Sequence, residues 1–223
     1  MINVILADDH AVVRTGMRRL LDDYGDIMVV AEAENGDDAY TLFLEFQPDV
    51  LILDMDMPDS SGLATLARLI AREPSARVLM FSSKPEMTFA VQAISAGAKG
   101  YILKSSSAED MVFAIRQLSR GKSYLSPEVA QEIAIHKLSA TENPIQSLTP
   151  REFEIFRLLA EGEEVDSIAE RLKIGHKTVA NYQTSLKQKL NISTPIQLVR
   201  LALKHRVISL ELALLPMVVL NVE

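Results

Sequence analysis

The sequence predicts an α/β domain with a doubly wound five-stranded parallel sheet, followed by a small all-α domain of four helices. Three observations support this fold class. Short apolar runs without a helical period alternate with amphipathic stretches up to residue 122, as expected for β-α units in a parallel sheet. A polar stretch with one short helical pattern interrupts the alternation over residues 123–147. Between residues 148 and 208, four amphipathic segments follow one another, which indicates a helical bundle. The spacing of Thr149 and Glu152 predicts a capped start for the first of these helices, and Thr194 and Gln197 repeat it for the fourth.

The pattern of each segment justifies its place in the first domain. Val50 to Leu53 are apolar residues that lead into Asp54, as in a strand buried on both faces of a sheet. Ser106 and Glu109 form the pattern of a capping box at the start of the fifth helix. Strands are expected at residues 4–7, 28–30, 50–54, 78–82 and 101–104, and helices near residues 12–21, 39–46, 61–73, 85–96 and 106–120.

Polar side chains lie at the carboxyl ends of four of these strands, either as the last residue or directly after it. They are Asp8 and Asp9, Asp54, Ser82 and Lys104. The carboxyl ends of parallel strands line one crevice, where three carboxylates favour a divalent cation, most simply Mg²⁺. Ser82 and Lys104 suit a phosphoryl group, and Asp54 could be its nucleophilic acceptor. The alternative for Asp54 alone is a residue that ends the strand and caps the loop.

This constellation resembles the receiver domain of two-component response regulators over about residues 1–120. The matching residues are Asp8, Asp9, Asp54, Met57, Pro58, Gly62, Ser82, Lys104 and the run 97–101. The resemblance implies that Asp9, Asp54 and the backbone carbonyl of Asp56 bind Mg²⁺. Asp8 would reach the ion through water.

The same resemblance implies a switch. Asp54 would accept a phosphoryl group from a sensor histidine kinase, Ser82 would move toward that group, and Tyr101 would turn inward behind it. The movement would reshape the surface of the fourth helix, fifth strand and fifth helix, as a shift between two packings. The alternative for Tyr101 is an ordinary half-exposed strand aromatic.

Two charged residues beside the pocket depart from the family pattern. Asp56 lies two residues after Asp54, and Lys84 lies two residues after Ser82. In receivers these positions flank the phosphoryl group and influence its lifetime. We hypothesise that Asp56 and Lys84 pair across the pocket and hinder the hydrolytic water. The alternative is a solvated, unpaired couple on the surface.

The third helix of the second domain, expected from about His176 to Leu190, has one polar face. The opposite side contains Val179, Tyr182, Leu186 and Leu190. No acid occurs from residue 171 to residue 206. Such a helix suits the major groove of DNA, although a plain solvated face is the alternative. The residues expected to contact DNA are Lys177, Thr178, Asn181, Thr184, Lys187, Gln188 and Lys189.

This half resembles the LuxR-type helix-turn-helix of the NarL/FixJ class of response regulators. The matching runs are 148–152, 158–162, 168–172, 177–179 and 189–190. Three residues of the DNA-reading helix depart from the usual pattern of the class: Gly175, Ala180 and Tyr182. A tyrosine at the last of these positions resembles the GacA/UvrY branch of the class. DNA binding is therefore expected, but these residues do not identify the DNA sequence that the helix recognises.

The two ends of the chain differ in charge. Residues 1–125 contain 12 Lys/Arg and 18 Asp/Glu, a net charge of −6, whereas residues 148–208 contain 10 and 7, a net charge of +3. The chain has no cysteine, which excludes disulfides. An apolar strand that begins near Ile2 leaves no room for a signal peptide, so a cytoplasmic location and no membrane partner are expected.

The predicted domains are a receiver at 1–122, a linker with a short helix at 123–147, the helix-turn-helix domain at 148–208 and an apolar tail at 209–223. The tail is too short to span a membrane; it packs on the bundle, packs on a second protomer or forms an unstructured appendage, and the sequence does not choose.

The predicted function is a response regulator that binds promoter DNA, as a homodimer when phosphorylated, and is no enzyme beyond its own phosphoryl transfer and dephosphorylation. Asp54-Met55-Asp56 also looks like the DxD motif of haloacid-dehalogenase-type phosphatases. That alternative does not explain residues 148–208. A third hypothesis is a DNA-binding regulator that does not depend on phosphorylation.

Overall fold

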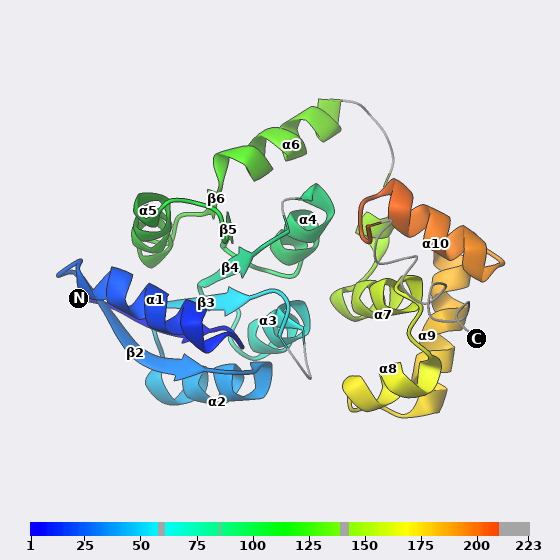
Figure 1. Cartoon of the computed structure of the whole chain (residues 1–223), viewed down its shortest axis with the longest axis horizontal. Helices are drawn as coiled ribbons and strands as arrows, with labels where there is room; N and C mark the ends of the chain where they lie inside the picture. Colours follow the sequence, from blue (N-terminus) through cyan, green and yellow to red (C-terminus); the bar gives the residue numbers. More distant parts are fainter. Residues whose placement is uncertain (58–60, 85, 139–142, 210–223) are drawn as a thin grey trace, which may run out of the picture. The chain divides into compact units, whose positions relative to one another are not determined.

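The computed structural model describes residues 1–57, 61–84, 86–138 and 143–209 (Figure 1). The chain divides into two compact units, residues 1–139 and 140–223. Pro58, Pro85, the middle of the expected tether and nearly all of the apolar tail lie outside the described residues. Within the described part, no helix is both long and apolar enough to cross a membrane.

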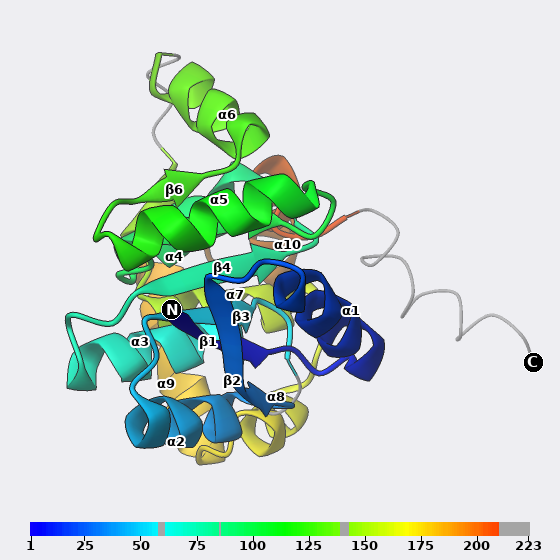
Figure 2. The same cartoon turned by 90° about the vertical axis from the view of Figure 1, so that its left-hand side faces the viewer.

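The first unit is the predicted doubly wound sheet. Its described strands are parallel and ordered β2-β1-β3-β4-β5-β6. Helices α1 and α5 pack on one face, and α2, α3 and α4 cover the other (Figures 1 and 2). The elements are β1 Ile2–Ala7, α1 Ala11–Asp22, β2 Ile27–Ala33, α2 Gly36–Phe46, β3 Val50–Asp54, α3 Gly62–Arg72, β4 Val78–Ser82, α4 Met87–Ser95, β5 Gly100–Leu103, α5 Ala108–Ser119, β6 Tyr124–Leu125 and α6 Pro127–Leu138.

Strand β3 occupies the middle of the sheet. It pairs with β1 on one side and with β4 on the other, and all five of its residues are buried. Because both faces are covered by helices, the strand needs side chains that are apolar throughout, which explains its sequence Val-Leu-Ile-Leu before Asp54. The carboxyl end of β3 therefore places Asp54 between the ends of β1 and β4.

One short strand extends the predicted sheet of five. Within the described residues, β6 adds a sixth strand parallel to β5, with Tyr101 opposite Leu125. Helix α6 follows it and belongs to the same unit: Val129 is fully buried, and the Glu132 carboxylate accepts a hydrogen bond of 3.1 Å from the Met87 backbone at the start of α4. The first compact unit thus extends past the predicted boundary at residue 122.

The second unit contains the helical bundle. Its described helices are a short 3-10 turn Pro144–Ser147, α7 Pro150–Ala160, α8 Val165–Arg171, α9 His176–Lys189 and α10 Pro195–Lys204. Thr149 and Glu152 form the capping box that their spacing predicts at α7, and Thr194 and Gln197 repeat it at α10. These caps satisfy backbone donors at the helix starts and so fix where each helix begins. The capping box expected from Ser106 and Glu109 at α5 is wrong by one residue: Ser107 is the cap, and its Oγ accepts a 3.1 Å hydrogen bond from the Asp110 backbone N–H.

Gly62 allows the loop after β3 to fold against Asp54. Its backbone N–H donates to the Met55 carbonyl at 2.9 Å, and a Cβ at this position would lie 1.9 Å from the Asp54 carbonyl oxygen. No other residue type fits without moving this loop.

We expect Gly62→Ala to lower the free energy of unfolding by about 3 kcal/mol, because the added methyl group collides with backbone. Gly16→Ala is the matched control, since none of the described atoms lies within 4 Å of its Cβ, and it should stabilise α1 by up to about 1 kcal/mol. Urea unfolding followed by circular dichroism measures both. Equal stability of the two variants would contradict the steric account.

Candidate functional site

Lys104 joins two buried carboxylates at the carboxyl edge of the sheet. Its Nζ lies 2.7 Å from Asp8 Oδ2 and 3.0 Å from Asp54 Oδ1. Asp8 follows β1, Asp54 ends β3, and Lys104 follows β5. The structure therefore brings together side chains that the sequence places at separate strand ends. Asp8 and Asp54 are each 2% exposed, so the two carboxylates of this ion pair are shielded from water.

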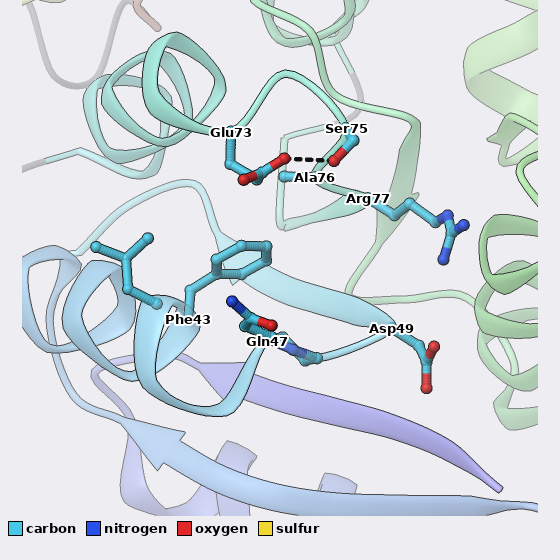
Figure 3. A pocket seen from close by; sticks show the side chains of 9 residues that line it. Phe43, Gln47, Asp49, Glu73, Ser75, Ala76 and Arg77 are labelled. Carbon is cyan, nitrogen blue, oxygen red and sulfur yellow. Dashed lines mark hydrogen bonds between the residues drawn. The ribbon is translucent and has the colours of Figure 1, made fainter.

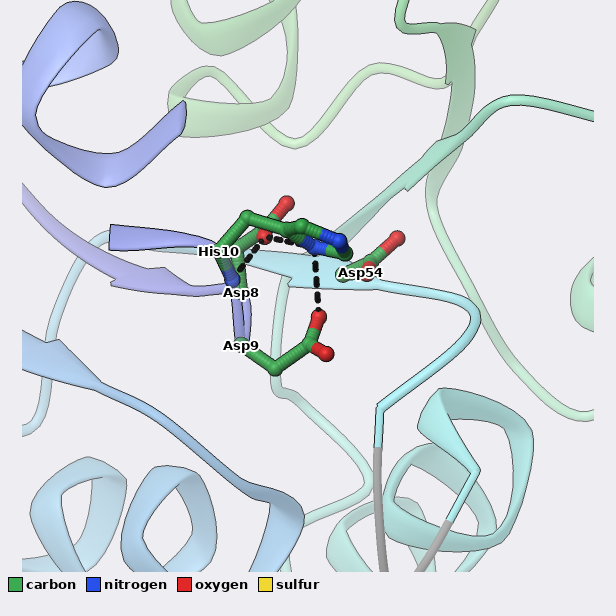
Figure 4. A group of neighbouring side chains, drawn as sticks. All are labelled: Asp8, Asp9, His10 and Asp54. Carbon is green, nitrogen blue, oxygen red and sulfur yellow. Dashed lines mark hydrogen bonds and ion pairs between the residues drawn. The ribbon is translucent and has the colours of Figure 1, made fainter. Parts of the chain in front are cut away.

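The acidic cluster has the composition of a cation site. Asp8, Asp9, His10 and Asp54 each offer a ligand atom, and these atoms all lie within 4.8 Å of one another (Figure 4). Asp54 Oδ2 is buried and has no hydrogen-bond partner among the described residues. A buried carboxylate oxygen without a donor is costly, and a bound cation would remove that cost. The three carboxylates of this set thus fit Mg²⁺, which prefers oxygen ligands.

Burial and charge oppose one another at this cluster. Burial raises the pKa of Asp54 above its ordinary value, the Lys104 ammonium opposes that effect, and the charge of Asp8 adds to it. Burial alone would lower the pKa of Lys104, but its ion pairs with Asp8 and Asp54 outweigh burial and raise the pKa. Lys104 therefore stays protonated at neutral pH.

Lys84 connects the remaining pocket residues. Its Nζ lies 2.9 Å from Asp56 Oδ1, which confirms the predicted pair, and 4.5 Å from the centre of the Phe89 ring. Its backbone N–H donates to Ser82 Oγ at 3.0 Å. Its carbonyl accepts a 2.7 Å hydrogen bond from the Tyr101 hydroxyl. The loop after β4 is therefore held at three points.

Tyr101 is fully buried, so the half-exposed alternative is wrong. Burial raises the pKa of its phenol well above the ordinary value, and the hydroxyl stays a hydrogen-bond donor. Ser82 is also fully buried at the end of β4. Both residues thus lie in the interior of the first unit.

Two residues of the site escaped the sequence analysis. His10 Nδ1 lies 2.8 Å from Asp9 Oδ1 and 3.2 Å from Asp8 Oδ1. Arg14 is buried in α1, where it donates to the Asp8 backbone carbonyl at 2.6 Å and pairs with Glu34 at 2.6 Å. The position of His10 directly after the acidic pair was a usable signal. Arg14 gave none, because an arginine in an amphipathic helix ordinarily indicates the solvent face.

A separate pocket of about 300 Å³ lies at the opposite, amino end of β3 and β4 (Figure 3). Three of its polar side chains have partners within the protein: Ser75 Oγ donates to Glu73 at 2.5 Å, and Asp49 accepts from the Asn3 backbone at 2.8 Å. None of the residues that line this pocket belongs to the acidic cluster, so the pocket is separate from the acidic site.

Helix α9 exposes the face that its sequence predicts. Lys177, Thr178, Asn181, Thr184, Gln188 and Lys189 are exposed, and Lys187 is half-buried. Val179, Leu186 and Leu190 are buried against the bundle, whereas Tyr182 is half-buried. The second unit therefore exposes a polar stripe of α9 made of Lys177, Asn181, Thr184 and Gln188.

Lys189 differs from the rest of the predicted DNA-contacting set. Its Nζ lies 2.8 Å from Glu152 Oε2, so it has an acidic partner, contrary to an expectation based on the absence of acids from residue 171 to residue 206. Glu152 belongs to α7 and is distant in sequence. It also accepts hydrogen bonds from the Thr149 backbone at 2.9 Å and from Ser185 Oγ at 3.3 Å. One carboxylate thus caps α7 and fastens α9 to it.

Two family models match the chain. Residues 4–116 match the response regulator receiver domain, and residues 146–202 match the bacterial regulatory proteins of the luxR family. The chain is 35% identical over 207 residues to the response regulator UvrY of Escherichia coli (strain K12). The aligned residues cover 92% of this chain and 95% of that protein. It is 36% identical to the response regulator GacA of Pseudomonas aeruginosa, over 92% and 97% of the two chains.

Solved structures agree with these matches. RcsB from Salmonella enterica serovar Typhimurium, bound to promoter rprA in the presence of phosphomimetic BeF₃⁻, superposes with a TM-score of 0.69 at 25% identity, over 90% of this chain and 97% of that one. A LuxR-family two-component response regulator from Aurantimonas sp. SI85-9A1 gives a TM-score of 0.60 at 36% identity, over 62% and 99%.

Glu152→Gln should destabilise the helical unit in a pH-dependent way. Burial alone would raise the pKa of Glu152, but hydrogen bonds from Lys189 and Thr149 outweigh it and hold the pKa below its ordinary value. A lowered folded pKa means that the charged form stabilises the fold above the unfolded pKa, and that this stability is lost as pH falls through the folded pKa.

Denaturant unfolding at pH 7 should therefore separate wild type from Glu152→Gln by about 1–2 kcal/mol, and the difference should vanish in acid. Glu163→Gln removes an ion pair with Arg171 that is more exposed, and serves as the control with a change below about 1 kcal/mol. A Glu152 effect that did not depend on pH would refute the charged contact.

Proposed function

The chain belongs to the response regulators that join a receiver domain to a LuxR-type helix-turn-helix domain and regulate transcription, and we propose that a phosphoryl group on Asp54 controls this regulation. The observation that carries the proposal is the Asp54 carboxylate at the end of β3. One oxygen contacts Lys104 at 3.0 Å, and the other is buried without a partner among the described residues. The phosphatase alternative does not account for the second domain.

The chemistry is a transfer between two proteins. The Asp54 carboxylate attacks phosphorus, the bond from phosphorus to a histidine nitrogen of a sensor kinase breaks, and the electron pair remains on that nitrogen, which takes up a proton. Lys104 neutralises a phosphoryl oxygen, and Ser82 donates its hydroxyl to another.

Asp8, Asp9, Asp54 and the backbone carbonyl of Asp56 are the groups that would hold Mg²⁺, which supplies charge neutralisation at the phosphoryl oxygens. No activity on other substrates is proposed.

The contacts of the β4–α4 loop supply a route from Asp54 to the linker helix. Ser82 Oγ accepts from Lys84, so turning this hydroxyl toward a phosphoryl group changes the loop that Tyr101 also holds. The same loop leads into α4, whose first backbone N–H donates to Glu132 of α6. A local change in hydrogen bonding can thus bias the packing of α4 and α6.

DNA recognition is proposed for the exposed face of α9. Asn181 and its neighbours would meet base edges, and Lys177 and Lys187 would meet phosphates. The RcsB relatives include a structure of two dimers bound to two parallel DNAs. For this chain we propose a homodimer on a repeated site, because two linked domains multiply the affinity of one.

Acetyl phosphate with Mg²⁺ should add one phosphoryl group to the wild type, as measured by intact mass, and Asp54→Asn should remain unmodified. Asp56→Asn is the matched control, because it changes a carboxylate two residues away and should still form the adduct. Phosphorylation of Asp54→Asn at the wild-type level would place the acceptor elsewhere. Rapid turnover without a trapped adduct would favour a phosphatase.

Lys84→Ala should shorten the lifetime of the phosphorylated protein. The pair between Lys84 and Asp56 obstructs water beside Asp54, and a partly exposed ion pair is worth up to about 1 kcal/mol, equivalent to roughly fivefold in rate. Loss of the adduct over time measures the rate, with Lys99→Ala, at an exposed lysine before β5, as the control. An unchanged lifetime for Lys84→Ala would show that the pair does not slow hydrolysis of the phosphorylated Asp54.

A further inference from the structure

We propose that the acidic pocket also selects first-row transition-metal ions that bind imidazole nitrogen, such as Fe²⁺, Co²⁺ and Zn²⁺, with His10 as a ligand beside Asp8, Asp9 and Asp54. The proposal rests on the proposed function of the pocket as a cation site and names a further class of cation. It starts from the position of His10, which no part of the phosphoryl chemistry uses.

The His10 ring is folded onto the carboxylates. His10 is the residue before α1, and its side chain makes no capping hydrogen bond to the described residues of that helix. Its backbone N–H donates to Asp8 Oδ1 at 2.8 Å, and its ring Nδ1 lies within 3.2 Å of both carboxylates of the acidic pair. Figure 4 shows the ring over Asp8 and Asp9 and pointing toward Asp54.

The spacing of these atoms matches a coordination shell. Ligands at about 2.1 Å from one ion lie roughly 3.0 Å apart along an octahedral edge and about 4.2 Å apart across it. His10 Nδ1 lies 2.8 Å from Asp9 Oδ1 and 3.2 Å from Asp8 Oδ1. All four ligand atoms lie within 4.8 Å of one another, so a small contraction closes the shell.

The Lys104 contacts leave the required oxygens available. Lys104 uses Oδ2 of Asp8 and Oδ1 of Asp54, and so occupies one oxygen of each carboxylate. Asp54 Oδ2 is the buried oxygen without a partner among the described residues, and Asp8 Oδ1 is the oxygen that His10 approaches. The ammonium thus lies on one side of the carboxylates and the ring lies on the other.

The chemistry of the ligands distinguishes cation classes. Mg²⁺ takes oxygen ligands and water, so His10 adds little to its binding. Fe²⁺, Co²⁺ and Zn²⁺ accept imidazole readily, so His10 adds a direct bond to them. The chain contains no cysteine, and thiolates therefore cannot compete for these ions.

Calorimetric titration of the full chain with Co²⁺ and, separately, with Mg²⁺ tests the proposal. His10→Gln should weaken Co²⁺ binding about 10- to 100-fold and change Mg²⁺ binding less than about threefold. Visible absorption of the Co²⁺ complex should change in the same variant, because a nitrogen ligand is lost. His176→Gln is the matched control: His176 is equally exposed and lies 3.4 Å from Asp166, and its loss should leave both affinities unchanged.

Equal weakening of both ions by His10→Gln would mean that the ring only shapes the acidic cluster, and no weakening would mean that it is no ligand; either result overturns the proposal. Retained Mg²⁺ binding by the variant shows that its pocket is folded. Phosphorylation by acetyl phosphate with Mg²⁺ is scored separately. If wild type forms no adduct, the proposed function fails, whereas an adduct together with unchanged Co²⁺ binding in His10→Gln refutes the metal inference alone.

Discussion

The contact on which the first unit depends is the bridge from Lys104 to Asp8 and Asp54. Two carboxylates with 2% exposure cannot remain charged side by side without a positive partner, and Lys104 contacts both within 3.0 Å. The order of the strands makes this contact possible, because β3 lies between β1 and β4. Gly62 completes the geometry by letting the loop after β3 pass the Asp54 carbonyl. The sheet thus presents charges that a cation and a phosphoryl group can neutralise.

Glu152 has a corresponding structural role in the second unit. It satisfies the start of α7 through Thr149 and holds α9 through Lys189, so a single carboxylate fixes both the beginning of α7 and the position of α9. The face of α9 that carries Asn181 is then set by the bundle beneath it. This assigns Lys189 a structural contact in addition to the DNA contact that the sequence predicts.

The sequence was sufficient where local patterns determine structure. The apolar run before Asp54 identified the central strand, and the capping boxes located α7 and α10. The hypothesis that Lys84 pairs with Asp56 came from the resemblance to receivers, in which these positions flank the phosphoryl group, and the structure contains this pair. The sequence did not predict two contacts for which it has no local pattern. Strand β6 has only two residues and exists through pairing with β5, and Lys189 pairs with Glu152, which is 37 residues away.

The central claim is that charge added at Asp54 controls DNA binding by α9. The direct measurement is the affinity of the full chain for a DNA fragment selected from a genomic pool, at one fixed salt concentration, before and after treatment with acetyl phosphate and Mg²⁺. The account predicts tighter binding by treated wild type and no change for Asp54→Asn. Equal affinity of all four samples would contradict it and would identify a regulator whose DNA binding does not depend on phosphorylation.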